Sequence, residues 1–191
     1  MKKKLMITAV ITMVLMLSAV MAGCGNDSCS NSSKQDSSAS ENVSDKVPAF
    51  ETKDIEGNTV SSDIFADKDI TVLNVWGTFC GPCIGEMPEL AQWDKELPDN
   101  VQILGLVIDV PEDTESDEAM TVMEDAKKIV SEAGVEFTNI VPDSELQKFL
   151  SNVSGVPTTF FVNSKGEIIG DPIVGADVKA YMDFVKNNLN N

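Results

Sequence analysis

Histidine and arginine are both absent from this sequence of 191 residues, and all 14 of its basic residues are lysine. Cysteine is scarce, with four in the whole chain, at positions 24, 29, 80 and 83. A structural zinc ion usually takes four thiolate or imidazole ligands. No imidazole is available here, and Cys24 and Cys29 lie in a polar segment far along the chain from the other pair. The composition therefore argues against a zinc site.

Acidic residues outnumber basic ones by 31 to 14, which gives a formal charge of −17 at pH 7. A surface of this sign repels nucleic acid and anionic lipid headgroups, so we expect neither as a binding partner. The densest acidic run covers 112–118. Such a run could bind calcium, but it has no regular ligand loop. Acidic residues at the start of a helix are the simpler account.

One apolar run is long enough to cross a membrane, and it lies at the N-terminus. Three lysines precede the uncharged segment 5–22, an arrangement typical of an export signal, although its length also permits a membrane anchor. The run ends in Met21-Ala22-Gly23-Cys24, which resembles the bacterial lipoprotein box with Met in place of the more usual Leu. The resemblance implies cleavage before Cys24 and lipidation of that residue. An ordinary signal peptide or an uncleaved anchor is the alternative.

The chain is expected to divide into a signal peptide (1–23), a tether (24–45) and one domain (46–191). The stretch 25–45 contains eight serines and one sizeable apolar residue, Val43. Such a segment cannot bury enough apolar surface to fold, so we expect a flexible tether. Cys29 lies within it and is not expected to take part in the main chemistry. The remaining residues are enough for one domain with a proper core, and no internal repeat is visible.

Alternating strand and helix patterns across 46–191 indicate an α/β domain with a mixed sheet flanked by helices. Strands are expected at 49–53, 59–61, 70–76, 101–108, 137–141, 158–162 and 167–170, the last two joined as a hairpin. Helices are expected at 83–97 with a kink at Pro88, from Met120 to Ala133 with a stop at Gly134, at 144–151, and over a last segment from Val178 to Leu189.

The most informative motif is Cys80-Gly81-Pro82-Cys83, which stands between the strand at 70–76 and the helix after it. The N-terminus of a helix favours a thiolate over a thiol at Cys80, because free N–H groups and the helix dipole stabilise negative charge there. Cys83 lies one turn later on the same face, close enough for a disulfide. Pro82 fits the first turn, where its missing N–H breaks no helical bond. These features indicate a redox-active dithiol.

Three alternatives to redox chemistry exist for this motif. A purely structural disulfide would close a very short loop, which constrains the unfolded chain little. Half of a zinc site lacks its other two ligands. A chance spacing in a buried core is the third alternative.

Together with Gly155-Val156-Pro157-Thr158 about 75 residues later, the motif resembles the thioredoxin fold. The segment Glu86-Met87-Pro88 and the extra helix and strand across 109–141 resemble, more narrowly, the membrane-anchored TlpA/ResA-type thiol–disulfide oxidoreductases of bacteria. The resemblance covers 47–189 and implies an N-terminal hairpin and a central helix–strand insertion. In cytosolic thioredoxins a buried Asp precedes the first cysteine by six residues. Asn74 stands there in this chain and cannot titrate.

The resemblance also implies roles for individual residues. Cys80 would be the exposed nucleophile, and the more buried Cys83 would resolve the mixed disulfide. Pro157 would be a cis-proline facing the dithiol, the alternative being an ordinary trans proline of a turn. Val156 would then pair through its main chain with an extended client segment. Trp76 would pack beside the site or serve as a plain core aromatic.

Glu86 follows the second cysteine by three residues, where relatives of this type place a carboxylate. A partly buried carboxyl has a raised pKa and can exchange protons with Cys83 near neutral pH. The alternative is an exposed glutamate on the helix surface.

The expected function is reduction of disulfides in exported proteins at the outer face of the cell membrane, with no cofactor and as a monomer. The Gly-Pro dipeptide between the cysteines is that of reducing thioredoxins. The resemblance implies an integral-membrane electron donor, and apocytochrome c or an exported methionine sulfoxide reductase as the client. Relatives that deliver copper use a histidine, and peroxiredoxins use a Thr-x-x-Cys with an arginine, which this chain lacks. A disulfide-forming oxidase and a non-catalytic binding lipoprotein are the alternatives.

Overall fold

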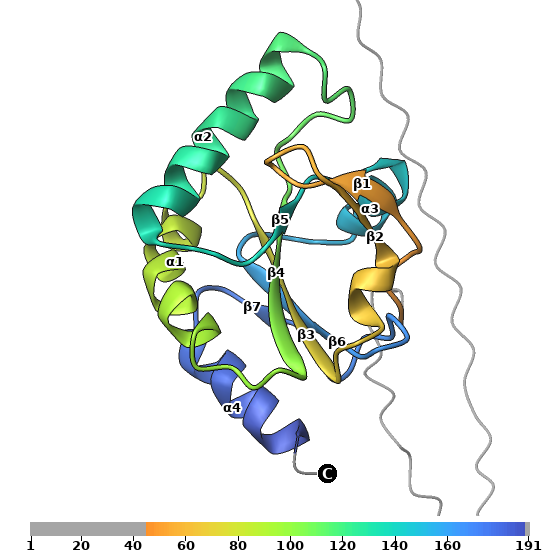
Figure 1. Ribbon diagram of the computed structural model, residues 1–191, viewed down its shortest axis with the longest axis vertical. Helices are drawn as coiled ribbons and strands as arrows, with labels where there is room; N and C mark the ends of the chain where they lie inside the picture. The colour runs from red at the N-terminus through yellow and green to blue at the C-terminus, as the bar shows by residue number, and fades with distance from the viewer. Residues whose placement is uncertain (1–44, 190–191) are drawn as a thin grey trace, which may run out of the picture. The chain divides into compact units, whose positions relative to one another are not determined.

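The computed structural model describes residues 45–189, which form the α/β fold expected from the sequence (Figure 1). The strands are β1 (Glu51–Lys53), β2 (Thr59–Ser61), β3 (Ile70–Trp76), β4 (Val101–Val107), β5 (Asn139–Ile140), β6 (Thr158–Val162) and β7 (Ile173–Val174). The helices are the 3-10 turn η1 (Ser62–Phe65) and the α-helices α1 (Gly81–Asp94), α2 (Asp117–Ala133), α3 (Ser144–Leu150) and α4 (Val178–Asn188).

The central sheet has five strands in the order β5-β4-β3-β6-β7. β3 pairs in parallel with β4 and antiparallel with β6, so the sheet is mixed as expected. Every residue of β3 is buried, because this strand lies in the middle of the sheet with both faces covered. The C-terminal end of β3 therefore carries the cysteine motif directly onto the N-terminus of α1.

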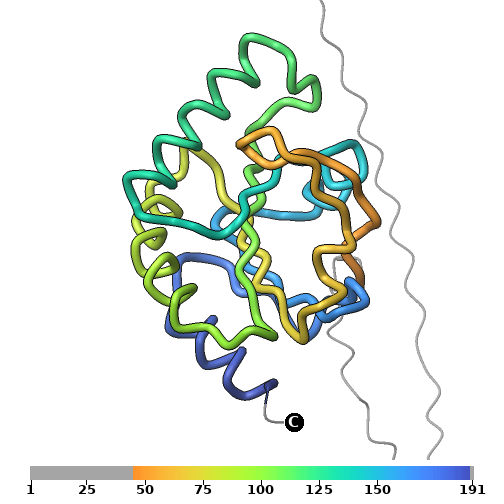
Figure 2. The backbone as a smooth tube through the Cα atoms, viewed as in Figure 1, coloured from red at the N-terminus to blue at the C-terminus, as the bar shows by residue number. Residues whose placement is uncertain are grey.

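Two hydrophobic clusters fill the space on the two faces of the sheet. Val72, Trp76 and Phe161 point to one face, where they pack with residues of α1, α2 and α4. Leu73, Val75 and Phe160 point to the other, where α3, η1 and the chain before β1 cover them. The alternation follows from the two-residue period of a strand. Figures 1 and 2 show α1, α2 and α4 on one side of the sheet and α3 with the β1–β2 hairpin on the other.

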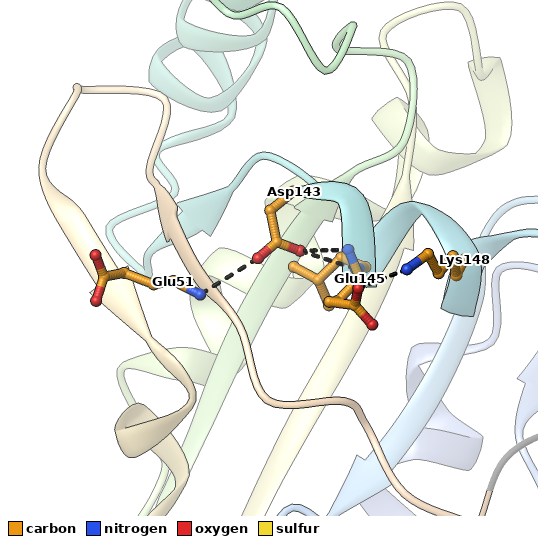
Figure 3. Close-up of polar contacts among 5 residues, drawn as sticks. Glu51, Asp143, Glu145 and Lys148 are labelled. Atoms are coloured by element: carbon orange, nitrogen blue, oxygen red, sulfur yellow. Dashed lines mark hydrogen bonds and ion pairs between the residues drawn. The ribbon is translucent and has the colours of Figure 1, made fainter.

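The N-terminal hairpin is attached to the rest of the domain partly through Asp143, which precedes α3 (Figure 3). Asp143 Oδ1 accepts hydrogen bonds from the backbone N–H groups of Glu145 (3.1 Å) and Leu146 (2.8 Å) and so caps this helix. Its Oδ2 accepts the N–H of Glu51 on β1 at 3.3 Å. One carboxylate therefore joins the hairpin to the start of α3.

Several expected boundaries need correction. The first helix spans Gly81–Asp94 and not 83–97, because Cys80 caps it two residues earlier and its last turn tightens into Glu96 N–H···O Trp93 and Leu97 N–H···O Asp94 bonds. The helix is continuous through Pro88. The acidic run 112–118 does lead into a helix, since Ser116 caps α2 and Asp117 and Glu118 occupy its first turn.

The hairpin expected between 158–162 and 167–170 is reduced to a turn and a single bridge from Val162 to Ile168. Gly170 has φ of +71°, and Pro172 cannot donate a ladder bond, so pairing is interrupted there. The strand that pairs with β6 is instead β7, whose Ile173 and Val174 lie opposite Thr159 and Thr158.

Candidate active site

Cys80 and Cys83 form a disulfide at the N-terminus of α1, with a separation of 5.3 Å between their Cα atoms. Cys80 is the N-cap residue, and its Sγ accepts the backbone N–H of Cys83 at 3.2 Å. An N-cap normally supplies an oxygen for this purpose. After reduction the same N–H points at the Cys80 sulfur, and together with the helix dipole it stabilises a thiolate there.

The two cysteines differ in accessibility in the expected order, but neither is widely exposed. Cys80 keeps 5% of its surface and Cys83 none, so the expectation of an exposed Cys80 is wrong for this disulfide form. The backbone carbonyl oxygen of Val156 lies 3.5 Å from Cys80 Sγ. The peptide bond between Val156 and Pro157 is cis, as the sequence motif predicts.

The other residues expected near the dithiol occupy distinct positions. Gly81 and Pro82 are both exposed in the first turn of α1. Trp76 is fully buried in the same hydrophobic cluster as both cysteines, and its indole N–H donates to Asn139 Oδ1 at 2.9 Å. It is therefore a core aromatic that also packs in the cluster behind the site.

Glu86 is buried, with 5% of its surface exposed, which contradicts the alternative of a surface glutamate. Its carboxyl lies between the sheet and α4 in a small polar cluster. Asn74 Nδ2, from β3, donates to Glu86 Oε1 at 2.9 Å and to Thr159 Oγ1 at 3.1 Å. The Tyr181 hydroxyl, from α4, lies 3.2 Å from Glu86 Oε2 and donates to the Gly175 carbonyl oxygen at 2.8 Å.

Burial raises the pKa of Glu86 to about 7, because the charged carboxylate loses its hydration. Hydrogen bonds from Asn74 and Tyr181 oppose this rise, and the negative charge of Glu89 adds to it. Burial likewise raises the pKa of Tyr181 to about 12, so this hydroxyl stays protonated at neutral pH. Glu86 can therefore exchange a proton near pH 7, three residues along the helix from Cys83.

Asn74, Thr159 and Tyr181 were not identified as site residues from the sequence. Thr159 and Tyr181 are 85 and 95 residues from the groups they contact, and no local pattern links them. From the sequence, Asn74 stands out only as a departure from thioredoxin. Its place on the face of β3 that packs against α1 is readable from the alternation of that strand, and this was the available signal.

Neither a metal site nor a membrane span is found in residues 45–189. This part of the chain brings together no group of three or more Cys, Asp or Glu side chains suited to a metal ion. None of its helices is long and apolar enough to cross a bilayer. The signal segment, Cys24 and the tether up to residue 44 lie outside the described residues.

The sequence matches the model of the AhpC/TSA family over residues 43–170. The chain belongs to this family. The ResA thiol-disulfide oxidoreductase of Bacillus thuringiensis is 26% identical to it over 142 residues, which cover 74% of this chain and 75% of the relative. The expected resemblance to ResA-type proteins is thereby confirmed.

Two solved structures show the same fold. A DsbE-type thiol:disulfide interchange protein from Chlorobium tepidum has a TM-score of 0.60 and 21% identity, covering 78% of this chain and 96% of that protein. The exposed lipoprotein thioredoxin of Streptococcus pneumoniae has a TM-score of 0.54 and 21% identity, covering 73% and 99%. With Cys80 and Cys83 as its cysteine pair, this protein is a thiol–disulfide oxidoreductase of the ResA type.

Proposed function

We propose that this oxidoreductase reduces disulfide bonds in exported client proteins at the outer face of the cell membrane. The observation that carries the proposal is the Cys80–Cys83 pair at the start of α1, with Gly81 and Pro82 between the two cysteines in the sequence and Glu86 buried one helical turn after Cys83. The Gly-Pro dipeptide is shared with thioredoxin, which has a potential of about −270 mV, whereas the oxidant DsbA lies near −120 mV.

The reaction starts from the reduced dithiol. The Cys80 thiolate attacks one sulfur of the client disulfide, and the other client sulfur leaves as a thiolate that takes up a proton from solvent, in place of the proton that Cys80 had released. The Glu86 carboxylate then accepts the proton of the Cys83 thiol. The Cys83 thiolate attacks the Cys80 sulfur and releases the second client thiolate, which takes the proton that Glu86 holds. Two electrons and two protons pass to the client, and the Cys80–Cys83 disulfide remains.

Support for client binding comes from the surface around the disulfide. The Val156 carbonyl next to Cys80 is a main-chain acceptor that an extended client segment can pair with, as an added strand does. Phe79 is 70% exposed beside Cys80, and Ile84, which follows Cys83, is 36% exposed. These apolar side chains offer contacts that do not depend on one client sequence.

The proposed location follows from the N-terminal sequence. The box ending at Cys24 would give a lipid anchor, and the polar tether 24–45 would hold the domain near membrane partners. Stable anchoring needs more than one acyl chain, which bacterial lipoproteins carry. That a structural neighbour is an exposed lipoprotein thioredoxin agrees with this arrangement. An integral-membrane donor would return electrons to the disulfide, and apocytochrome c or an exported methionine sulfoxide reductase would receive them.

Cysteine variants test the mechanism directly. We expect Cys80→Ser to abolish reduction of insulin disulfides, because the attacking thiolate is lost. Cys83→Ser should instead accumulate a mixed disulfide through Cys80, detectable by mass spectrometry after a non-reducing gel, because nothing resolves it. Full turnover in Cys80→Ser, or a wild-type protein unable to reduce insulin, would contradict the proposal and favour a non-catalytic binding protein.

The anchor is tested separately from the chemistry. Cys24→Ala should leave insulin reduction by the purified protein unchanged, while the protein is lost from the membrane fraction or its processing is blocked. The matched control is Cys29→Ala, which removes the neighbouring thiol and should remain on the membrane. A wild-type protein without lipid on Cys24 by mass spectrometry would refute the anchor.

A further inference from the structure

The Tyr181 hydroxyl lies between two parts of the site that are far apart in sequence. On one side is the carboxyl of Glu86, with Oε2 at 3.2 Å. On the other is the carbonyl oxygen of Gly175 at 2.8 Å. The backbone N–H of Asp177 donates to the same hydroxyl oxygen at 3.3 Å. A phenol has a single proton, so it can donate fully to only one of the two acceptors at a time.

Gly175 also holds the loop that covers Cys80. Its backbone N–H donates to the carbonyl oxygen of Pro157 at 2.8 Å, and the residue before it, Val174, pairs with Thr158. Gly175 has φ of +95°, a conformation that favours glycine. Gly175 therefore holds the cis-proline loop through its N–H and accepts the hydrogen bond of the Tyr181 hydroxyl through its C=O.

We infer that Tyr181 is a positioning residue that couples the protonation of Glu86 to the cis-proline loop on which the client docks. When Glu86 is a carboxylate, it attracts the phenol proton strongly, because hydrogen bonds to ionised acceptors are the stronger ones. Gly175 then loses its donor. When Glu86 has taken the proton of Cys83, the phenol returns to Gly175. The hydrogen bonding of the cis-proline loop therefore changes when the proton passes from Cys83 to Glu86. This inference rests on the proposed function.

The ionisable groups that face Glu86 limit what else could produce such a signal. Glu89 lies on the same helix, and its charge acts on Glu86. Tyr181 comes from α4 and stays protonated at neutral pH, while Asn74 and Thr159, from the sheet, do not titrate. In the disulfide form the two cysteines do not titrate either. A change near pH 7 in the oxidised protein can therefore be assigned to Glu86.

The sequence allows a selective measurement on the full-length protein in detergent. Tyr181 is the single tyrosine of the chain, and Val174-Gly175 is its single Val–Gly dipeptide. Carbonyl-labelled valine combined with nitrogen-labelled glycine thus yields one filtered amide signal, that of Gly175. In the oxidised wild type, we expect the Gly175 amide and the Tyr181 ring to titrate together near pH 7. Glu86→Gln should abolish both titrations.

Tyr181→Phe removes the hydroxyl oxygen and keeps the aromatic ring. It therefore tests the hydrogen bonds of Tyr181 separately from its packing in the core. The Gly175 amide should lose its titration, while a carboxyl-labelled Glu86 still titrates. Its midpoint should rise by roughly one pH unit, because the lost hydrogen bond favoured the carboxylate. Should this variant fold poorly, global replacement with 3-fluorotyrosine, whose hydroxyl is a stronger donor, should move the midpoint the opposite way. An unchanged Gly175 titration in Tyr181→Phe, or no shift with fluorotyrosine, would overturn the inference.

Client kinetics distinguish this inference from the proposed function. In single-turnover insulin reduction, Tyr181→Phe should resolve the mixed disulfide about fivefold more slowly at pH 7, since less Glu86 is ionised, and recover at pH 9. A wild-type protein that does not reduce insulin would refute the proposed function. The pH titration of the Gly175 amide would still test the coupling between Glu86 and the cis-proline loop. Wild-type activity with an identical pH profile in Tyr181→Phe would refute the coupling alone.

Discussion

Glu86 is a buried carboxyl whose surroundings raise its pKa into the range where it can transfer protons near neutral pH. Its carboxyl receives hydrogen bonds from Asn74 and Tyr181, yet burial still raises its pKa to about 7. Asn74 Oδ1 is itself buried without a partner among the described residues. A cluster of this kind carries a cost in stability, because an unpaired buried oxygen and a desolvated carboxyl both oppose folding.

The cost of Glu86 predicts a specific pH dependence of stability. A carboxyl with an unfolded pKa near 4.5 and a folded pKa near 7 binds more protons when folded. The free energy of unfolding should therefore fall as pH rises from about 4.5 to 7, by up to about 3 kcal/mol, and remain reduced above pH 7. Below pH 4.5 this contribution to the pH dependence vanishes.

Glu86→Gln should remove this component. Urea unfolding of the oxidised proteins at pH 5 and pH 8 is the measurement, since the disulfide keeps the cysteines from titrating. Relative to the wild type, the variant should gain stability at pH 8. Parallel pH dependences in the two proteins would show that Glu86 does not titrate near neutrality.

The sequence identified Glu86 by its spacing from Cys83, but it did not identify the groups that set its pKa. Periodicity along α4 marks Tyr181 as buried, and a buried tyrosine is equally consistent with plain packing. Only the packing of α4 beside α1, on the same face of the sheet, brings its hydroxyl to the carboxyl. Contacts between residues 95 positions apart depend on topology, which local patterns do not encode.

At the level of secondary structure, β4 and β5 approach so closely that one position permits only glycine. Gly105 on β4 pairs with Asn139 on β5. A Cβ atom at Gly105 would lie 1.9 Å from Asn139 Oδ1 and 3.1 Å from Trp76 Nε1. These two atoms form the hydrogen bond of the buried indole, so a side chain there must displace Asn139 and leave the indole N–H unpaired.

Gly105→Ala should therefore destabilise the protein by about 2–3 kcal/mol, from overpacking and a lost buried hydrogen bond. Chemical denaturation monitored by tryptophan fluorescence measures this directly. Gly85→Ala is the matched control: its Cβ on α1 would meet nothing within 4 Å, and the change should stabilise by about 0.5–1 kcal/mol. Equal stabilities of the two variants would refute the close approach.

The accuracy of the sequence-based elements follows the strength of their patterns. The apolar run 70–76 coincides with β3, because a central strand is buried on both faces. The start of α1 was placed two residues late, since a cysteine is not an obvious cap. The sequence does not predict β7, because a strand of two residues between Pro172 and Gly175 is too short to show an alternating pattern. The apolar pair at 168–169 follows a clear turn and therefore favours a hairpin there.

At the scale of the whole molecule, the groups that the proposed reaction uses lie together at one end of the sheet. The end of β3 delivers the dithiol, the loop before β6 covers it, and α1 and α4 enclose the carboxyl. The sequence predicted the dithiol, the cis-proline and the fold through recognisable motifs.

The direction of electron flow is a property of the whole domain, because it depends on the relative stability of the dithiol and disulfide forms.

The most direct test is the reduction potential of the Cys80–Cys83 couple, measured by equilibrating the protein against thiol–disulfide buffers and counting free thiols. A reductase requires a potential near or below about −240 mV, which is the result we predict. A potential above about −150 mV would contradict the central claim. It would make the protein an oxidant that forms disulfides in its clients.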